Sequence, residues 1–320
     1  MLNVILTGVV SFIITSIAAP IIIPILKRLK FGQSIREIGP SWHEGKKGTP
    51  TMGGIIFIAA ITIVALIFSM RTPTIIFLVA GALAFGAIGF LDDYIKVVLK
   101  RNLGLRAWQK FSLQLIAAVI FVVCGMHFGI LDSEIYIPFT KILVNFDIFY
   151  IPFAVFVILA EVNGVNLTDG IDGLASSVTA VIMLFFAAML FLFGNLDGAL
   201  YATAVLGGLL GFLLYNKNPA KVFMGDTGSL FLGGVVAALA LLLKQPFLLI
   251  PMGIIYIAEA ASVVIQVLIH KFFGKRVFKM SPIHHHFELC GWKENKIVKA
   301  FCLVTFVASA ISLIAVVILL

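Results

Sequence analysis

Charge is scarce in this chain. Only 12% of its 320 residues are Asp, Glu, Lys or Arg, about half the share usual in soluble domains, whereas 61% are hydrophobic. Such a sequence cannot surround a core with a polar surface in water, so its solvent is a lipid bilayer. A water-soluble enzyme is therefore excluded, and no nucleic-acid partner is expected.

Cysteine is rare as well, and no segment suggests a separate soluble domain. The three cysteines lie in predicted spans or in a predicted inner loop, so no disulfide framework is expected. The sequence shows no internal repeat and no low-complexity tract. We therefore expect one polytopic membrane domain over residues 1–320.

Apolar stretches of bilayer-spanning length recur along the whole chain. A transmembrane helix needs roughly 17–25 predominantly apolar residues. We predict an all-α integral membrane protein with about ten transmembrane helices. The expected spans are about 3–26, 52–70, 74–91, 111–130, 148–162, 174–193, 199–214, 228–243, 247–269 and 297–318.

The basic residues predict the orientation of these spans, because Lys and Arg accumulate in cytoplasmic loops. With the N-terminus outside, all of the 23 basic residues except Arg71, Lys141 and Lys244 fall in inner loops. We therefore expect both termini outside and five loops in the cytoplasm. The net charge of +8 is then a property of the cytoplasmic face.

Five aspartates lie at the predicted cytoplasmic ends of spans, where ionisable groups are costly and are candidates for function. They are Asp92, Asp93, Asp169, Asp172 and Asp226. We expect Asp169 and Asp172 to begin the sixth helix and Asp226 to begin the eighth, where a carboxylate can simply cap free N–H groups. Capping and function therefore both remain open for these three.

Asp92 and Asp93 differ, because they end the third span, where a carboxylate opposes the helix dipole by about 0.3–1 kcal/mol. Capping therefore cannot explain them, and neither can packing. An ion pair between Asp92 and Lys96, four residues later, accounts for one of the two. We therefore interpret the pair as functional, and we expect the active site on the cytoplasmic face.

Three further segments suit phosphate groups. "EGKKGTPTMGG" (44–54) and "GDTGS" (225–229) each precede or begin a helix whose free N–H groups can bind an anion. "SPIHHHFELCGW" (281–292) has three consecutive histidines but no zinc-ligand pattern, so either a solvated run or hydrogen bonding to an anionic substrate is possible. Aspartates, lysines and helix N-termini at one face favour Mg²⁺-assisted phosphoryl transfer, with a lipid as one substrate.

Four motifs in this order, "LDDYIKV", "NLTDGIDGLA", "NPAKVFMGDTGSL" and "SPIHHHFEL", resemble those of the phospho-N-acetylmuramoyl-pentapeptide transferases, a family of polyprenyl-phosphate N-acetylhexosamine-1-phosphate transferases. The resemblance implies Mg²⁺-dependent transfer of phospho-MurNAc-pentapeptide from UDP-MurNAc-pentapeptide to undecaprenyl phosphate, giving lipid I and UMP for peptidoglycan synthesis. It also implies a multi-pass protein of the bacterial cytoplasmic membrane that forms a homodimer.

The resemblance also implies roles for individual residues. Asp226 would bind Mg²⁺, and Asp92 and Asp93 would handle the lipid phosphate, with Asp92 as base. His284, a further catalytic residue, would contact the sugar-nucleotide phosphates together with His285 and His286. Asp172 would read uracil beside Phe223. The full set of implied substrate-binding residues is Lys46, Thr51, Lys96, Asn166, Asp169, Asp172, Asn216, Phe223, Gly225, Ser229, His285 and His286.

Several alternatives remain open at this point. A sister enzyme that transfers GlcNAc-1-phosphate to the same carrier has the same aspartate motifs, and an ion-coupled transporter also carries intramembrane acids, although usually near the bilayer midplane.

The mechanism is open as well. The lipid phosphate could attack directly, which we favour, or an aspartate could form a covalent intermediate. Glu259, which we take as the one acid near the middle of a span, is either a buried hydrogen-bonding residue or the site of a helix break. Residues 132–147 are expected to form an outer hairpin.

Overall fold

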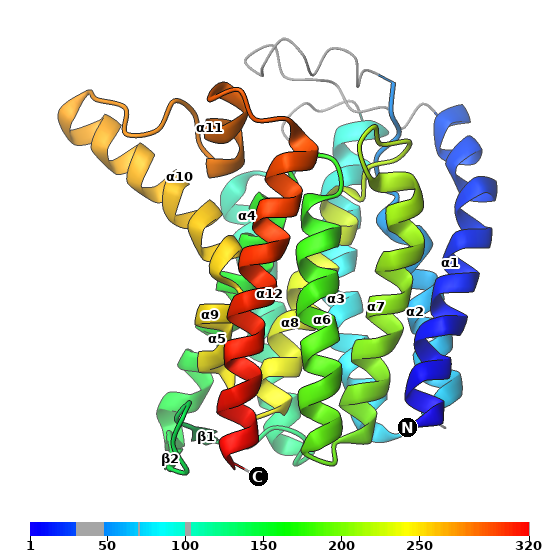
Figure 1. The fold of residues 1–320 in the computed structure, drawn as a ribbon, viewed down its shortest axis with the longest axis vertical. Coiled ribbons are helices and arrows are strands. Elements are labelled where there is room, and N and C mark those ends of the chain that lie inside the picture. Colours follow the sequence, from blue (N-terminus) through cyan, green and yellow to red (C-terminus); the bar gives the residue numbers. More distant parts are fainter. Residues whose placement is uncertain (30–47, 70, 100–103, 320) are drawn as a thin grey trace.

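The computed structural model describes residues 1–29, 48–69, 71–99 and 104–319, and it shows a bundle of long helices that run side by side (Figure 1). The helices are α1 (Leu2–Arg28), α2 (Gly54–Phe68), α3 (Pro73–Val97), α4 (Ala107–His127), α5 (Tyr150–Thr168), α6 (Leu174–Leu192), α7 (Leu196–Asn216), α8 (Gly225–Leu242), α9 (Leu249–Met252), α10 (Ile254–Phe273), α11 (Ile283–Leu289) and α12 (Glu294–Leu319).

The predicted all-α membrane architecture is confirmed. Within the described residues, nine helices are long and apolar enough to cross a membrane, and the shorter apolar α2 matches the remaining predicted span. Two helices run six residues past their predicted ends: α3 continues to Val97 instead of 91, and α5 continues to Thr168 instead of 162. Glu161, which our predicted span placed at its end, therefore lies near the middle of α5 and is buried. The prediction that Glu259 is the one acid near the middle of a span was wrong.

The ninth predicted span is broken. Instead of one helix over 247–269, a 3₁₀ turn (Pro246–Leu248) leads into the short α9, and Gly253 separates α9 from α10. Pro251 has no backbone N–H, so it cannot make the usual bond to the turn before it. Beyond the break, α10 inclines away from the bundle (Figure 1). The break is thus at Gly253 and not at Glu259.

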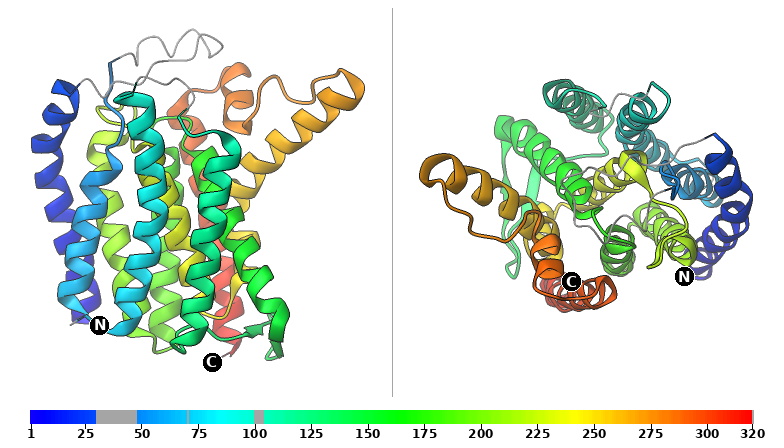
Figure 2. Two further views of the ribbon diagram at one scale, coloured as in Figure 1. Left: turned by 180° about the vertical axis from the view of Figure 1, so that it is seen from behind. Right: turned by 90° about the horizontal axis from the view of Figure 1, so that it is seen from above.

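Helix α8 occupies the centre of the bundle, between α3 and α5, as the view from above shows (Figure 2). Its sequence "GDTGSLFLGGVVAALALL" is small or apolar on all sides, which suits a helix surrounded by other helices. The helix pair α3–α8 packs very closely at Gly89, where an added Cβ would lie 2.1 Å from the carbonyl oxygen of Asp226. This contact fixes the start of α8 against the end of α3.

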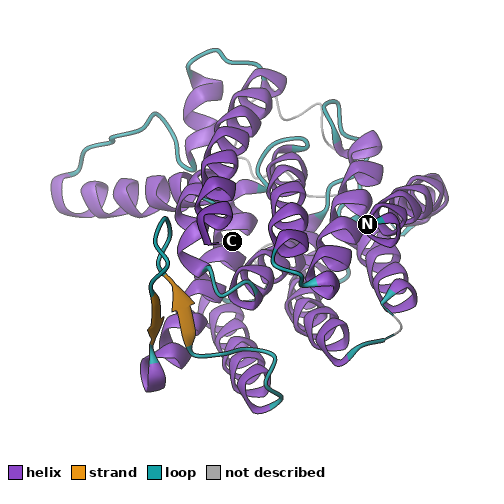
Figure 3. Ribbon diagram, turned by 60° about the horizontal axis from the view of Figure 1, so that its bottom comes forward, coloured by secondary structure: helices purple, strands orange, loops and turns teal. Residues whose placement is uncertain are grey.

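The two ends of the bundle differ. Both chain termini and the predicted hairpin, formed by antiparallel β1 (Glu134–Tyr136) and β2 (Leu143–Asn145), lie at one end (Figures 1 and 3). Lys244 anchors this hairpin through ion pairs with Asp132 and Glu134 at 2.7 and 3.1 Å. The end of α3, the starts of α2 and α8, and α11 lie at the opposite end.

Candidate functional site

Asp93 joins α3 to the N-terminus of α8. Its carboxylate accepts hydrogen bonds from the backbone N–H of Asp226 (3.2 Å) and Thr227 (2.9 Å) and from the Thr227 hydroxyl (2.6 Å). These are free donors at a helix start, the groups that an N-cap normally satisfies. We had predicted that capping cannot explain this aspartate, and for Asp93 that prediction was wrong. Asp93 is buried and caps α8 instead of its own helix, α3.

Asp92 faces the loop that follows α3. One carboxylate oxygen accepts the backbone N–H of Leu105 at 2.7 Å, and the other forms the predicted ion pair with Lys96. Gly104, at φ +58°, allows this loop to approach, since a Cβ there would lie 2.6 Å from the Asp92 carboxylate. Asp92 is therefore buried, and its first physical effect is to hold the Lys96 ammonium in place.

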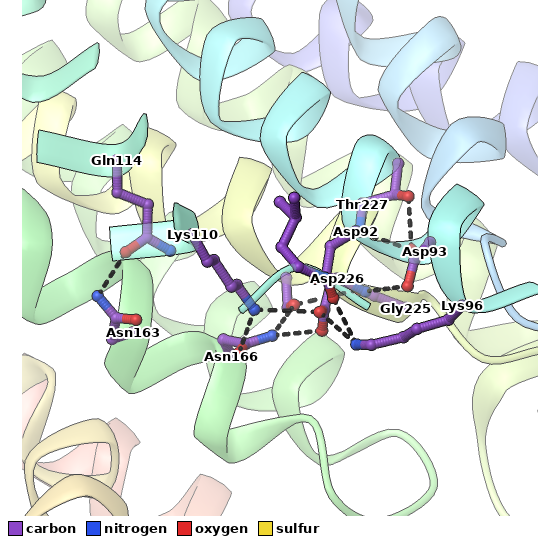
Figure 4. Close-up of polar contacts among 12 residues, drawn as sticks. Asp92, Asp93, Lys96, Lys110, Gln114, Asn163, Asn166, Gly225, Asp226 and Thr227 are labelled. Atoms are coloured by element: carbon purple, nitrogen blue, oxygen red, sulfur yellow. Dashed lines mark hydrogen bonds and ion pairs between the residues drawn. The ribbon is translucent and has the colours of Figure 1, made fainter. Parts of the chain in front are cut away.

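Asp226, the second residue of α8, is where these interactions meet (Figure 4). One of its oxygens accepts from the ammonium groups of Lys96 (2.8 Å) and Lys110 (3.0 Å), and the other from the side-chain amide of Asn166 (2.8 Å). The Asn166 amide group also bonds the Ser229 hydroxyl at 2.8 Å. Four helices, α3, α4, α5 and α8, thus contribute side chains to one cluster.

Lys110 is the residue that sequence reasoning missed. It lies in the first turns of α4, and its ammonium also bonds the side-chain oxygen of Asn166 at 3.1 Å. In the sequence it is one of many basic residues flanking a span, which topology alone explains. Only the packing of α4 against α5 distinguishes it from the others, so no local signal could have found it.

The segments before α2 and α8 lie side by side at the same end. Phe223 donates its N–H to the Pro50 carbonyl at 2.9 Å and accepts the Gly53 N–H at 2.8 Å. Gly225 has φ +71°, and a Cβ there would lie 2.5 Å from the Asp93 carboxylate and 2.8 Å from the Thr51 hydroxyl. The structure thereby brings the predicted residues Thr51, Phe223 and Gly225 next to the aspartate cluster.

The two aspartates of "TDGIDG" do not begin α6, as we had predicted. Asp169 caps the C-terminus of α5, and α6 begins only at Leu174, after Gly173 at φ +73°. Burial, followed by the nearby carboxylates of Asp226, Asp93 and Asp172, raises the pKa of Asp169 well above its usual range.

Asp172 and Asn216 organise the loop between α7 and α8. Asp172 accepts from the Asn218 amide (3.0 Å) and the Ala220 N–H (2.9 Å). Asn216 is buried, accepts from Ser176 at 2.7 Å and donates to the Val222 carbonyl at 3.0 Å. These contacts position the loop that leads to Phe223. Direct contact of either residue with a substrate stays a prediction.

The three histidines of α11 point to different partners. His284 is buried and pairs with Glu259 of α10 at 3.0 Å. His285 pairs with Glu288 at 2.7 Å, and His286 accepts the Lys279 N–H at 3.2 Å. The ring centroids of His284 and His285 lie 4.1 Å apart, but the three histidines bond different partners. Lys46, the remaining predicted site residue, lies outside the described residues.

The oxygen-rich donors around Asp226 suit a hard cation. In the described part of the chain, no group of three or more His, Cys, Asp and Glu side chains could hold a metal by itself. Mg²⁺ needs no such group, because it usually binds one or two carboxylates, water and substrate phosphates. If ionised, the carboxylates of Asp92, Asp93 and Asp226 exceed the ammonium groups of Lys96 and Lys110 by one charge. The donor chemistry therefore fits Mg²⁺ shared with a substrate.

Comparison with known proteins connects this cluster to a family. The model for glycosyl transferase family 4 matches residues 74–244, from α3 to the end of α8, and a phospho-N-acetylmuramoyl-pentapeptide-transferase signature matches residues 46–58. A phospho-N-acetylmuramoyl-pentapeptide-transferase of Caldanaerobacter subterraneus subsp. tengcongensis is 51% identical over 97% of this chain and 98% of its own length. The chain belongs to this family.

Other relatives extend the match over the same range. Phospho-N-acetylmuramoyl-pentapeptide-transferases of Clostridium novyi and Listeria monocytogenes are 50% and 49% identical, over 93% and 96% of this chain and 92% and 96% of theirs. The resemblance drawn from the four motifs is thus confirmed. The chain is a multi-pass membrane enzyme of the glycosyl-1-phosphate transferase kind.

Proposed function

We propose that this protein moves phospho-MurNAc-pentapeptide from UDP-MurNAc-pentapeptide to undecaprenyl phosphate, with Mg²⁺, giving lipid I and UMP. The observation that carries the proposal is the Asp226 carboxylate, held between two ammonium groups and an amide at one end of a transmembrane bundle. The names of the relatives support the choice of the muramoyl-pentapeptide donor.

The two lysines have capacity for phosphate. An ammonium group has three N–H donors. Lys96 directs two of them to Asp92 and Asp226, and Lys110 directs two to Asn166 and Asp226. Within the described residues, each lysine therefore keeps one donor for a phosphate oxygen. Both side chains are partly exposed, at 35% and 18%, so a substrate can reach them.

Asp226 would hold the Mg²⁺ ion, with the amide oxygen of Asn166 and the hydroxyl of Ser229 close by. Bound there, Mg²⁺ would neutralise phosphate charge and favour attack at phosphorus. The helix N-terminus of α8 lies at the same place and also favours negative charge. The residues of the chain thus supply orientation and positive charge, which is most of what phosphoryl transfer requires.

The geometry supports direct attack by the lipid phosphate. A new bond would form between a lipid phosphate oxygen and the sugar-linked phosphorus, while the bond from that phosphorus to UMP breaks. Phosphate oxygens are already nucleophiles, and the Asp226 carboxylate, paired with two ammonium groups, is better suited to hold the metal than to attack phosphorus. Asp92 would orient Lys96 and take up any proton left on the attacking phosphate. Trapping a phosphorylated enzyme without lipid acceptor would contradict this route.

The proposal includes the location of the enzyme. We place the end of the bundle that carries Asp226 at the cytoplasmic face of the bacterial inner membrane, where the nucleotide donor is available. The homodimer implied by the resemblance stays a prediction, which the mass of the purified protein in detergent would test.

UMP release by the purified enzyme tests the proposed reaction. We expect release with UDP-MurNAc-pentapeptide and undecaprenyl phosphate, loss of release on Mg²⁺ removal, and none with UDP-GlcNAc. Lys110→Gln should lower the rate by about 100-fold or more, because it removes a preorganised charge from the site. Lys244→Gln, a matched change in the hairpin anchor at the other end, should leave the rate unchanged. Release with UDP-GlcNAc alone would favour the GlcNAc-1-phosphate alternative.

A further inference from the structure

A buried acid–histidine pair connects α10 to α11. The carboxylate of Glu259, which is fully buried, lies 3.0 Å from Nδ1 of His284 and 3.4 Å from the backbone N of the same residue. Both contacts use the same carboxylate oxygen, Oε2. They fix the ring of His284 relative to its own backbone, and therefore determine where its second nitrogen points.

That second nitrogen, Nε2, is buried and has no hydrogen-bond partner among the described residues. It faces Gly170 in the turn between α5 and α6, and a Cβ on Gly170 would lie only 2.1 Å from it. Gly170 itself is exposed. Gly170, which is exposed and has no side chain, thus lies between Nε2 of His284 and the outside of the protein. For Nε2 to bond a ligand, this turn would have to move away from it.

The position of this turn relates Nε2 to the aspartate cluster. Gly170 directly follows Asp169, whose carboxylate is close enough to those of Asp226 and Asp93 to be affected by their charges. Asn166, one of the Asp226 partners, lies one helical turn before Gly170 on the same segment. Nε2 therefore faces the side of the site formed by the end of α5.

The resemblance implies that His284 contacts a phosphate of the nucleotide donor. We propose that Glu259 is the positioning residue for this contact, because it holds His284 so that Nε2 faces the turn at Gly170. This inference rests on the proposed function, because it assigns a substrate group to the same site. An imidazole that carries a proton on both ring nitrogens would donate from Nδ1 to Glu259 and from Nε2 to the phosphate oxygen. No covalent change occurs at either residue.

A purely structural role explains the Glu259–His284 pair less well than a role in substrate positioning does. Buried polar atoms in proteins are almost always hydrogen-bonded, so each exception requires an explanation. Within the described structure, this pair leaves two such atoms without a partner, Nε2 of His284 and Oε1 of Glu259. A ligand that bonds Nε2 accounts for the first of these, and packing alone accounts for neither.

Steady-state kinetics of the full-length enzyme, with each substrate varied in turn, test the proposal. Glu259→Ala should raise the KM for UDP-MurNAc-pentapeptide by about 10–100-fold, the range typical for loss of a residue that orients a ligand-binding histidine. The KM for undecaprenyl phosphate should stay within about twofold of wild type, since Lys96 and Lys110 are untouched. Glu259→Gln keeps an oxygen that can accept Nδ1–H, so it should recover most of the loss.

Gly170→Ala gives an independent test, because its Cβ would displace the imidazole from the other side. It should raise the same KM, and its effect should not add to that of Glu259→Ala, as expected for residues that act through one group. Ser262→Ala is the matched control: Ser262 is buried on α10 and bonds only the Glu259 carbonyl, at 2.7 Å. It should leave both KM values unchanged.

Two results would overturn the inference: equal effects of Glu259→Ala on both KM values, or additive effects of the two substitutions. Calorimetric binding of UDP-MurNAc-pentapeptide without lipid acceptor serves as the second measurement, and Glu259→Ala should weaken it by a similar factor. A wild-type enzyme that neither binds nor converts this donor refutes the proposed function itself. Normal wild-type activity with unaffected Glu259 variants refutes only the positioning role.

Discussion

Asp93 and Asp92 are neighbours in sequence with different physical tasks. Asp93 makes three hydrogen bonds to the start of α8, whereas Asp92 bonds the Leu105 backbone and Lys96. Adjacent helical positions point about 100° apart, so the two carboxylates face different elements. One aspartate therefore positions the helix that carries Asp226, and the other positions a lysine of the site.

This division predicts different defects for two similar substitutions. Asp93→Asn should lower the free energy of unfolding by about 1–3 kcal/mol, because it replaces a carboxylate that accepts three hydrogen bonds. Asp92→Asn should cost more activity per folded molecule. Thr227→Val removes one of the three bonds and should cost about 1 kcal/mol. Denaturant unfolding in detergent and UMP release measure these effects, and a larger loss of activity in Asp93→Asn would reverse the assignment.

Asp169 predicts a pH dependence of stability. Its pKa is raised by burial and by neighbouring carboxylates, so the folded state holds this proton at pH values where the unfolded chain, with a pKa near 3.9, has released it. The contribution of Asp169 to the free energy of unfolding is therefore present at low pH. It is lost as the pH rises through the pKa that Asp169 has in the folded protein. Asp169→Asn should therefore melt higher than wild type at pH 8, with a smaller difference at pH 5, in metal-free buffer. A difference independent of pH would contradict the assignment.

At the scale of elements, the contact of α3 with α8 depends on Gly89. A Cβ there would lie 2.1 Å from the Asp226 carbonyl oxygen, which is backbone and cannot rotate aside. Gly89→Ala should cost roughly 1–3 kcal/mol or more and should lower activity by shifting Asp226. Gly86→Ala, one turn earlier, meets the Phe231 side chain at 3.4 Å and should be neutral or stabilising by up to about 1 kcal/mol. Similar effects of the two would argue against close packing as the cause.

The hairpin at the other end of the bundle is a contrasting element. Its anchor, Lys244, pairs with carboxylates that are 48% and 41% exposed. Exposed ion pairs contribute only about 0–1 kcal/mol, and salt weakens them further. The Asp226 carboxylate is only 17% exposed and pairs with two ammonium groups, so we expect its ion pairs to contribute more than those of the hairpin.

At the scale of the whole molecule, the orientation in the membrane follows from which end carries which loops. Cys290 is exposed and lies just after α11, at the end of the bundle that carries Asp226. A membrane-impermeant maleimide should therefore label Cys290 in inside-out vesicles but not in intact cells. Lys141→Cys, in the hairpin segment, made in a Cys290→Ser background, should show the opposite pattern. Labelling of Cys290 from outside would reverse the orientation.

Composition and periodic hydrophobicity were sufficient to determine the class of the protein and most of its elements. A bilayer imposes helices of about 20 apolar residues, so spans are visible in a single sequence. The unusual position of the aspartates at span ends was visible for the same reason, because charge is rare in such segments. The four motifs identified the family, which the relatives confirmed.

Other features needed the tertiary structure. That Asp93 caps α8, that Lys110 joins Asp226 and that Glu259 faces His284 all depend on which helices pack together, and residues far apart in sequence give no local signal of this. The helix break at Gly253 could not be predicted from hydrophobicity, because the sequence is apolar both before and after it. The sequence by itself thus determined the membrane environment, the spans and the candidate acids. The packing of the helices decided which acid positions a helix, which holds a lysine and which faces a histidine.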